Sequence, residues 1–282
     1  MIVELPGLPG VGRDVLRAAL PRSRPTAASG LPDVEVGVRG VMQPRDRLAA
    51  YDRLCGLALR DAVSATWLHV LAFPLQAWLM ARTDFPFALA GIRHVTNEMR
   101  LLEPVVAGDR LDLRVRAAAL RPHRRGVVFD LVSEAAVDGR EVWQGTSTYL
   151  SARGSVPGEP APPLRLELPD APVAQQWRLP ADLGRRYAAV SGDTNPIHLH
   201  PLTARAFGLR RPIIHGMWTH ARALAALGGV LPERYAVRVQ FAKPLELPGR
   251  AGFAAAPDAG GSRFAVLNRE GKPHLVGELR PL

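Results

Sequence analysis

The chain has 282 residues, of which 47% are hydrophobic and 22% charged. This length suggests one large domain or two small ones, and the composition excludes a disordered chain. The longest apolar stretch, 62–80, is interrupted by Ser, Thr, His, Pro and Gln, so we expect no membrane span. The only cysteine, Cys55, cannot form an internal disulfide, and we therefore expect a cytoplasmic protein.

The formal net charge is +10. Lys243 and Lys272 are the only lysines, so arginine supplies nearly all of the positive charge. The arginines are scattered and lack aromatic neighbours arranged as stacking platforms. We therefore expect no nucleic-acid partner. They are typical of a solvated surface, although some are suited to an anionic ligand such as a nucleotide phosphate.

The first half predicts one helix followed by strands. Residues 1–33 are rich in Pro and Gly and predict an irregular leader with one short helix near 11–20. Alternation at 34–41 predicts a strand, and the apolar stretch 61–82 predicts a long helix that is kinked or broken at Pro74. Further strands, separated by turn formers at 108–109, 121–122 and 138–139, are predicted at 92–102, 110–118, 126–137 and 142–150.

The second half repeats this order after a proline-rich segment. The density of Pro in 151–172 predicts an extended linker, which divides the chain into domains at 34–150 and 173–282. A helical stretch is predicted over 201–227. Strands are predicted at 235–241, 250–256, 263–268 and 274–279.

Two short strings recur in the same order in both halves. Residues 51–56 resemble 187–192, and residues 102–108 resemble 242–249. Each half then reads as one apolar helix wrapped by antiparallel strands, which is an α+β arrangement, and the two halves together form a pseudo-dimer. Chance similarity of short apolar patterns is the alternative.

The most informative stretch runs from Tyr187 to His198. Ser191–Gly192 and Asn195–Pro196 are turn formers, so Asp193 is expected in a loop that folds back toward His198. A carboxylate and an imidazole brought together in this way can hold one water and share its protons. An isolated pair at this spacing is more typical of a helix cap and a surface histidine.

The wider string resembles the signature of the MaoC-like dehydratases, also called (R)-specific enoyl-CoA hydratases or hydratase 2. The likeness covers Tyr187, the core Ser191-Gly-Asp-x-Asn-Pro-Ile-His198, Ala204, the segment Pro212-Ile-Ile-His-Gly216, and Phe241, Pro244 and Gly249. The resemblance implies a double hot-dog fold of the α+β class, with two tandem units that each wrap a sheet around a long central helix.

The resemblance also implies an activity, which is addition of water to a trans-2-enoyl thioester to give the (3R)-hydroxyacyl thioester, or the reverse. Asp193 and His198 would be the acid–base pair. The backbone N–H of Gly216, at a helix N-terminus, would stabilise the negative charge that develops on the thioester oxygen.

Other residues near the motif are assigned to substrate binding. Asn195 is expected to shape the loop, and His215 to orient the start of the helix beside Met217. Arg210 and Arg211 are placed to reach phosphates of the carrier. The spacing of His198 and His200 could suggest a metal. His215 and His220 lack a fitting carboxylate or thiol companion pattern and no H-E-x-x-H occurs, so we expect no metal and no redox cofactor.

The first half lacks the catalytic pair, because Leu57 and Ala62 stand opposite Asp193 and His198 in the alignment of the two halves. We therefore expect the first unit to be catalytically empty. Its apolar helix suggests a widened acyl tunnel for medium or long chains, with ordinary core packing as the alternative for each side chain. The residues in question are Trp67, Leu71, Phe73, Leu75, Trp78 and Leu79.

The sequence thus predicts an enzyme, a hydro-lyase that acts on acyl-CoA in fatty-acid metabolism. One alternative is a 3-hydroxyacyl-ACP dehydratase of fatty-acid, polyketide or mycolate synthesis, since a basic surface suits both CoA and an acidic carrier protein. Another is a non-catalytic acyl-thioester-binding partner, and a hot-dog thioesterase is a weaker option. Either a homodimer or a pseudo-dimeric monomer fits.

Overall fold

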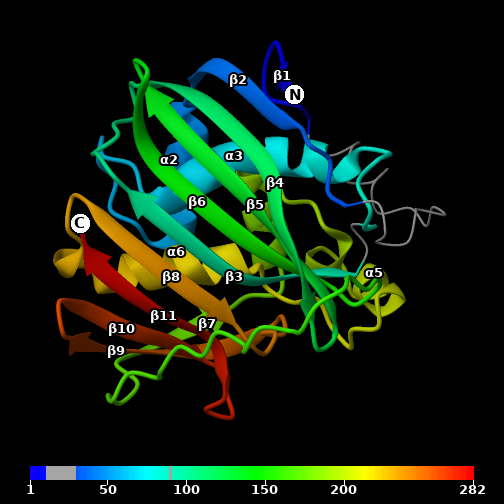
Figure 1. Cartoon of the computed structure of the whole chain (residues 1–282). Coiled ribbons are helices and arrows are strands. Elements are labelled where there is room, and N and C mark those ends of the chain that lie inside the picture. The colour runs from blue at the N-terminus through cyan, green and yellow to red at the C-terminus, as the bar shows by residue number, and fades with distance from the viewer. Residues whose placement is uncertain (11–29, 89–90) are drawn as a thin grey trace.

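The computed structural model describes residues 1–10, 30–88 and 91–282. These form one eleven-stranded sheet with the strand order β1-β2-β4-β5-β6-β3-β8-β11-β10-β9-β7. The sheet curves around two central helices, α3 (Ala65–Ala81) and α6 (Gly216–Leu227), which lie behind it in Figure 1. The short helix predicted at 11–20 lies outside the described residues.

Within residues 1–10, 30–88 and 91–151, the first half contributes six strands and two helices. The helices are α2 (Arg45–Cys55) and α3. The strands are β1 (Ile2–Glu4), β2 (Glu35–Met42), β3 (Ile92–Leu101), β4 (Arg110–His123), β5 (Gly126–Val137) and β6 (Arg140–Ser151). β1 pairs in parallel with β2, so part of the segment predicted as an irregular leader is in fact an edge strand.

The second half contributes five strands and five helical segments. The strands are β7 (Gln175–Leu179), β8 (Tyr235–Phe241), β9 (Gly249–Asp258), β10 (Gly261–Leu267) and β11 (Pro273–Pro281). The helical segments are α4 (Leu183–Ser191), the 3₁₀ turn η2 (Pro196–His198), α5 (Pro201–Ala206), α6 and the 3₁₀ turn η3 (Gly228–Val230).

The two halves are related by a pseudo-twofold arrangement centred on β3 and β8. These strands pair antiparallel from Thr96–Gln240 to Leu101–Tyr235. On either side the strand order is the same, with β6-β5-β4-β2 next to β3 and β11-β10-β9-β7 next to β8. The isolated bridges Ala62–Val106 and Ile213–Glu246 recur at equivalent points just before α3 and α6. This is the double hot-dog fold that the sequence predicted.

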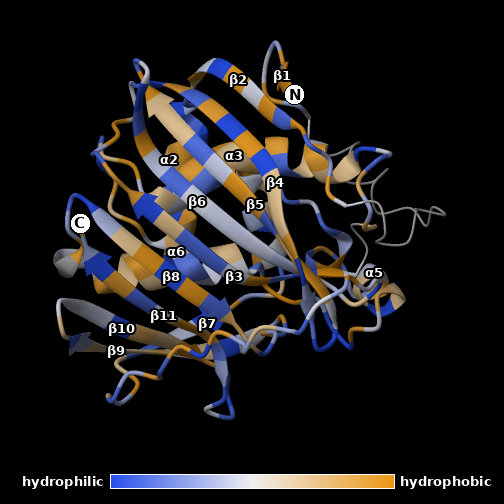
Figure 2. Ribbon diagram, viewed as in Figure 1, coloured by the Kyte–Doolittle hydropathy of each residue, from blue (hydrophilic) through white to orange (hydrophobic). Residues whose placement is uncertain are grey.

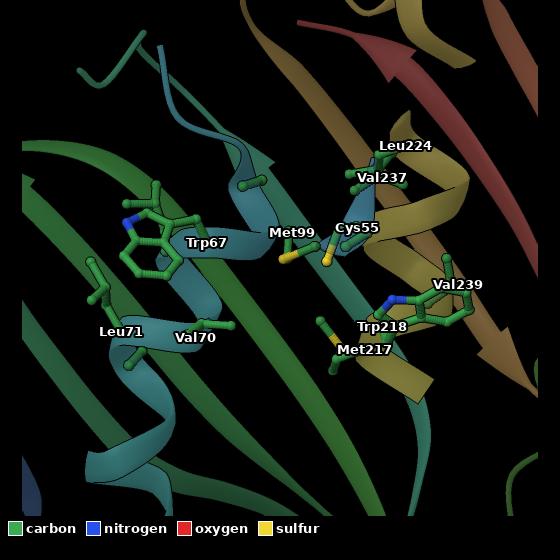
Figure 3. Packing of buried hydrophobic residues seen from close by; sticks show 14 of the residues in the cluster. Cys55, Trp67, Val70, Leu71, Met99, Met217, Trp218, Leu224, Val237 and Val239 are labelled. Atoms are coloured by element: carbon green, nitrogen blue, oxygen red, sulfur yellow. The ribbon is translucent and has the colours of Figure 1, made fainter. Parts of the chain in front are cut away.

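A single hydrophobic core joins the halves. Figure 2 shows hydrophobic and hydrophilic residues alternating along the strands, as expected for a sheet with one face on the core. Figure 3 shows Trp67 on α3 and Trp218 on α6 at the two sides of the core, with Met99 of β3 and Cys55 of α2 between them. Cys55 is fully buried and free, as expected for a small packing residue.

Most strands predicted from the sequence are confirmed, and 126–137 and 235–241 agree to the residue. The strand predicted at 110–118 continues to His123 through the expected break at Arg121–Pro122. Its pairing with β2 involves only residues 110–116, so Pro122 lies on a free edge where no donor is needed. A register irregularity between Ala118 and Arg121 takes up the local distortion.

The helix predictions are partly wrong. α3 is continuous through Pro74 and is not broken there, because most of its side chains are buried and tertiary packing supports it. The helix predicted over 201–227 is two helices. Gly208, with φ of 79°, and Pro212 separate α5 from α6 because neither residue favours continuation of a helix.

The segment 152–174 contains neither helix nor strand, and the domain boundaries on either side of it stay a prediction. None of the helices in the described ranges combines the length and the apolar character that a bilayer crossing requires.

The start of α3 is closed by a side chain from the other half. The Ser64 hydroxyl accepts the Trp67 N–H at 3.2 Å and caps the helix. The first helical N–H, of Ala65, donates to the Tyr235 hydroxyl at 3.2 Å. Tyr235 lies at the end of β8, and burial raises its pKa to about 12. The first N–H of α3 is therefore bonded to a protein group.

We predict that Tyr235→Phe destabilises the protein by about 1–3 kcal/mol, because it leaves the buried Ala65 N–H without an acceptor. Urea unfolding followed by circular dichroism measures this loss. Tyr51→Phe is the matched control, since the hydroxyl of Tyr51 is also buried but accepts no backbone N–H from the described residues. Equal stability loss in both variants would contradict the role of the Ala65 contact.

Candidate active site

The candidate site is built by the loop between α4 and α6. α4 ends at Gly192, whose φ of 81° is the left-handed conformation that glycine adopts most readily. Asp193 then accepts the Asn195 N–H through Oδ1 at 3.1 Å, and its own N–H donates to the Ser191 hydroxyl at 3.2 Å. The Asn195 side chain caps η2 by accepting the Ile197 N–H. These turn contacts aim the Asp193 carboxylate inward.

Asp193, His198 and His215 converge on one point. One oxygen of Asp193 and one ring nitrogen of each histidine lie within 4.8 Å of one another. The two imidazoles are stacked, with ring centroids 3.7 Å apart. His198 and His215 are buried, whereas the Asp193 side chain is 27% exposed because it borders a cavity. The predicted pair is therefore brought together, and His215 joins it.

Backbone carbonyls set the orientation of both histidines. His198 Nδ1 lies 2.7 Å from the Ile213 carbonyl, and His215 Nε2 lies 3.0 Å from the Asp193 carbonyl. A carbonyl oxygen only accepts, so each of these nitrogens carries the proton. His198 Nε2 is consequently left with a lone pair. His215 is bonded through Nε2 to the backbone of Asp193, and the orienting role that the sequence suggested for it stays a prediction.

Burial shifts the two members of the pair in opposite directions. It raises the pKa of Asp193 above its usual value, although the neighbouring His198 lowers it in part. Burial also lowers the pKa of His198, and the Asp193 charge and the Ile213 carbonyl only partly restore it. The pKa of His215 falls well below its usual value for the same reason. The site thus favours a neutral imidazole beside a carboxyl group that can hold a proton.

Gly216 is the first residue of α6, so its N–H has no acceptor within the helix. Its counterpart in the first half, Ala65, gives the equivalent N–H to Tyr235. A Cβ at Gly216 would lie 2.8 Å from Cε1 of Phe241, which explains why no larger residue fits. The Gly216 N–H and the positive end of the α6 dipole favour an oxygen that carries negative charge.

These groups face a cavity of about 490 Å³ that both halves line. The second half contributes Asp193, Asn195, His198, His215 and Gly216, together with Met217 and Phe241. The first half contributes side chains of α3, β3 and β6. These are His69, Val70, Phe73 and Met80 from α3, Ile92, Arg93 and His94 from β3, and Tyr149 from β6.

The predicted substrate-binding residues divide into two groups. Asn195, His215 and Met217 line the cavity. Arg210 and Arg211 are exposed and lie outside the lining, so their phosphate contacts stay a prediction. Two other basic residues, Arg93 and Lys243, are exposed and do line the cavity.

Of the six apolar residues suggested for an acyl tunnel, only Phe73 lines the cavity. The other five pack in or against the core, as the alternative interpretation held. The face of α3 that lines the cavity is instead formed by His69, Val70, Phe73 and Met80.

Sequence reasoning missed His69, although a signal for it exists. Trp67-x-His69 and Trp218-x-His220 are 151 positions apart, whereas Tyr51 and Tyr187 are 136 apart. The second half is therefore 15 residues longer between these points, in the region that carries η2 and α5. An alignment that allows this insertion places α3 on α6 and points to the first helix as part of the same site.

The comparisons with known proteins agree with this geometry. The family model described as "MaoC like domain" matches residues 166–255. The 3-hydroxyacyl-thioester dehydratase X of Mycobacterium tuberculosis is 38% identical over 254 residues, which is 89% of this chain and 91% of the relative. The chain belongs to the MaoC-like dehydratase family.

Two further comparisons concern a solved structure and a shorter enzyme. The crystal structure of HtdX from M. tuberculosis superposes with a TM-score of 0.78 and 35% identity, over 88% of this chain and all of that one. The (R)-specific enoyl-CoA hydratase of Aeromonas caviae is 34% identical over 80 residues, which is 27% of this chain and 60% of that enzyme.

We predict that Gly184→Ala impairs the site from a distance. A Cβ at Gly184 in α4 would lie 2.1 Å from the backbone carbonyl oxygen of His198, so the loop that carries His198 must move. We expect kcat to fall by about 10²-fold, as is typical of a small misplacement of a catalytic group. Steady-state kinetics measure this fall.

Arg186→Ala is the control, because Arg186 is an exposed side chain of the same helix. Wild-type kcat in a folded Gly184→Ala variant would contradict the close packing of Gly184 against the His198 backbone.

Proposed function

We propose that this protein interconverts (3R)-hydroxyacyl thioesters and trans-2-enoyl thioesters by removing or adding water. The observation that carries the proposal is the convergence of Asp193 and His198 beside the unpaired N–H of Gly216 in one cavity. The names of two relatives, 3-hydroxyacyl-thioester dehydratase X and (R)-specific enoyl-CoA hydratase, support the same chemistry.

In the dehydration direction, neutral His198 is the base and protonated Asp193 is the acid. His198 Nε2 takes the proton from C2, while the Asp193 carboxyl group protonates the C3 hydroxyl as the C3–O bond breaks and water leaves. Asp193 ends as a carboxylate and His198 as an imidazolium. In hydration each proton returns along the same route, so Asp193 takes a proton from water and His198 gives one to C2.

The N-terminus of α6 stabilises the charge that forms between these proton transfers. Loss of the C2 proton turns the thioester into an enolate, whose charge lies on the carbonyl oxygen. The Gly216 N–H, at the first residue of α6, has no acceptor among the described residues, and a donor of this kind is typically responsible for a 10²- to 10³-fold effect on kcat. The proposed reaction needs no metal, because Asp193 and His198 supply both proton transfers and the Gly216 N–H supplies the charge stabilisation.

The carrier of the acyl group is either CoA or acyl carrier protein. Both end in the same pantetheine arm, and Arg93 and Lys243 at the cavity are suited to a phosphate on either one. The α3 face from His69 to Met80 extends for about 16 Å at the helical rise, which favours medium or long acyl chains.

We predict that Asp193→Asn and His198→Gln each lower kcat by about 10²–10⁴-fold, because each removes one of the two proton-transferring groups. Loss of enoyl absorbance with crotonyl-CoA and trans-2-octenoyl-CoA measures the rate, and chromatography of the product tests for the (3R) configuration. Wild-type activity is expected to survive a metal chelator.

His200→Gln is the matched control, since His200 is exposed and its ring accepts only the Leu202 N–H. If wild type processes CoA esters and 3-hydroxyacyl-ACP equally poorly while binding them, the non-catalytic alternative replaces the proposal. Full activity in Asp193→Asn or in His198→Gln would show that the substituted residue takes no part in the mechanism.

We predict a bell-shaped pH profile of kcat/KM in both directions. The working state holds one proton on the pair, so activity falls at low pH when both groups are protonated and at high pH when both are deprotonated. Since burial lowers the pKa of His198 and raises that of Asp193, both limbs belong to the pair as a whole. A profile that is flat from pH 4 to pH 10 would contradict shared protonation.

A further inference from the structure

The wall that the first half adds to the cavity carries two neighbouring histidines, His69 and His94. On α3, His69 is followed by Val70, Phe73 and Met80, and on β3 His94 follows Ile92. The two imidazoles are stacked, with ring centroids 6.2 Å apart and planes 18° from parallel. A tunnel for a plain alkyl chain has no need of two histidines side by side.

Neither histidine is fully paired with protein. His69 is 3% exposed and its Nδ1 has no hydrogen-bond partner in the described part of the chain, and the same holds for Nε2 of His94. The neighbouring Tyr149 is different, because its hydroxyl donates to Gln76 Oε1 at 3.2 Å. An imidazole can turn about its χ2 bond, and for His69 such a turn breaks no protein hydrogen bond at Nδ1.

Leaving these nitrogens unpaired is costly. A buried polar group without a partner costs about 1–3 kcal/mol, whereas a leucine or phenylalanine fills a similar space at no such cost. Burial lowers the pKa of His69 to about 4, so its ring is neutral near pH 7 and offers one donor and one acceptor. A neutral ring of this kind suits an uncharged oxygen better than an anion.

The pair lies close to the reacting end of the chain. Gly216, whose N–H would hold the thioester oxygen, packs against Phe241, and the Phe241 ring is 5.0 Å from the His94 ring. His69 and Phe73 continue the wall away from that point along α3. An acyl chain that lies along this wall passes the two histidines a few carbons beyond C3.

We propose that His69 and His94 form a binding site for an uncharged oxygen on the acyl chain beyond C3, so that the preferred substrates are hydroxyacyl or oxoacyl thioesters with oxygen there. This inference rests on the proposed function for the direction of the chain. His69 Nδ1 and His94 Nε2, which no group in the described ranges satisfies, are shielded from the cavity, so the ring turns about χ2 to present its nitrogen to the oxygen. A site built to bond such an oxygen discriminates against a chain that lacks it.

Binding of unreactive ligands tests this site separately from turnover. Thioethers of pantetheine are suitable, because CoA and acyl carrier protein share that arm and a thioether does not react. The ligands are S-octyl-pantetheine and its versions hydroxylated at C5 or at C8, titrated by calorimetry. We expect one hydroxylated ligand to bind wild type about tenfold more tightly than the plain chain, as one or two buried hydrogen bonds would give.

Two kinds of variant separate hydrogen bonding from packing. In His69→Leu and His94→Leu the preference for the hydroxylated ligand should disappear, while the plain chain binds as well as before or better. In His69→Gln, which keeps a donor and an acceptor, part of the preference should remain. Wild type that binds the plain chain as tightly as both hydroxylated chains would overturn the inference, and so would a preference that survives in both leucine variants.

Turnover of trans-2-octenoyl-CoA distinguishes this failure from failure of the proposed function. Hydration of the plain chain without any preference for oxygenated ligands rejects the histidine site and leaves the proposed function intact. A clear preference in binding without turnover of any enoyl thioester rejects the proposed function and supports the histidine site. His220, the counterpart of His69 in α6, lies outside the cavity lining, and neither of its ring nitrogens has a partner among the described residues. A histidine at this helix position could therefore be a feature that both halves share without a role in binding. Loss of the binding preference in the leucine variants excludes that explanation for His69.

Discussion

The antiparallel pairing of β3 with β8 is the constraint on which the rest of the structure depends. These strands would be the exposed edges of two separate sheets, and an unpaired edge invites association. Their pairing makes one continuous sheet and brings α3 and α6 into one core. The cavity lies where the two halves meet, so neither half could form it alone.

The same arrangement supplies two helix N-termini, and the protein uses them differently. At α3 the first N–H is bonded to Tyr235, and Ser64 caps the helix. At α6 His215 stands at the N-cap position without capping through its side chain, and Gly216 keeps its N–H free beside the cavity. The difference coincides with the 15 additional residues that carry η2 and α5 in the second half. The two equivalent helices therefore differ at their first residue, because the N–H is bonded to a protein group in α3 and faces the cavity in α6.

The sequence predicted the fold class, and it failed where information is not local. Strand alternation and turn formers located β5 and β8 to the residue, whereas Asp193 and His198 were singled out by the resemblance to the family signature and not by turn chemistry alone. The break between α5 and α6 was missed because apolar periodicity outweighed Gly208 and Pro212. His69 and His94 were missed because nothing in a local pattern shows that α3 and β3 reach a loop more than 90 residues away.

Desolvation gives the pair its opposed character without any additional charged residue. Burial disfavours the charged form of every group, so it raises the pKa of a carboxyl group and lowers that of an imidazole. Asp193 and His198 share one desolvated point, and each therefore moves toward the neutral form that dehydration needs. The backbone carbonyl of Ile213 then decides which nitrogen of His198 is left free. Because Ile213 lies three residues before Gly216, the segment that leads into α6 sets the tautomer of the base. Proton transfer and charge stabilisation are in this way coupled through one short segment of backbone.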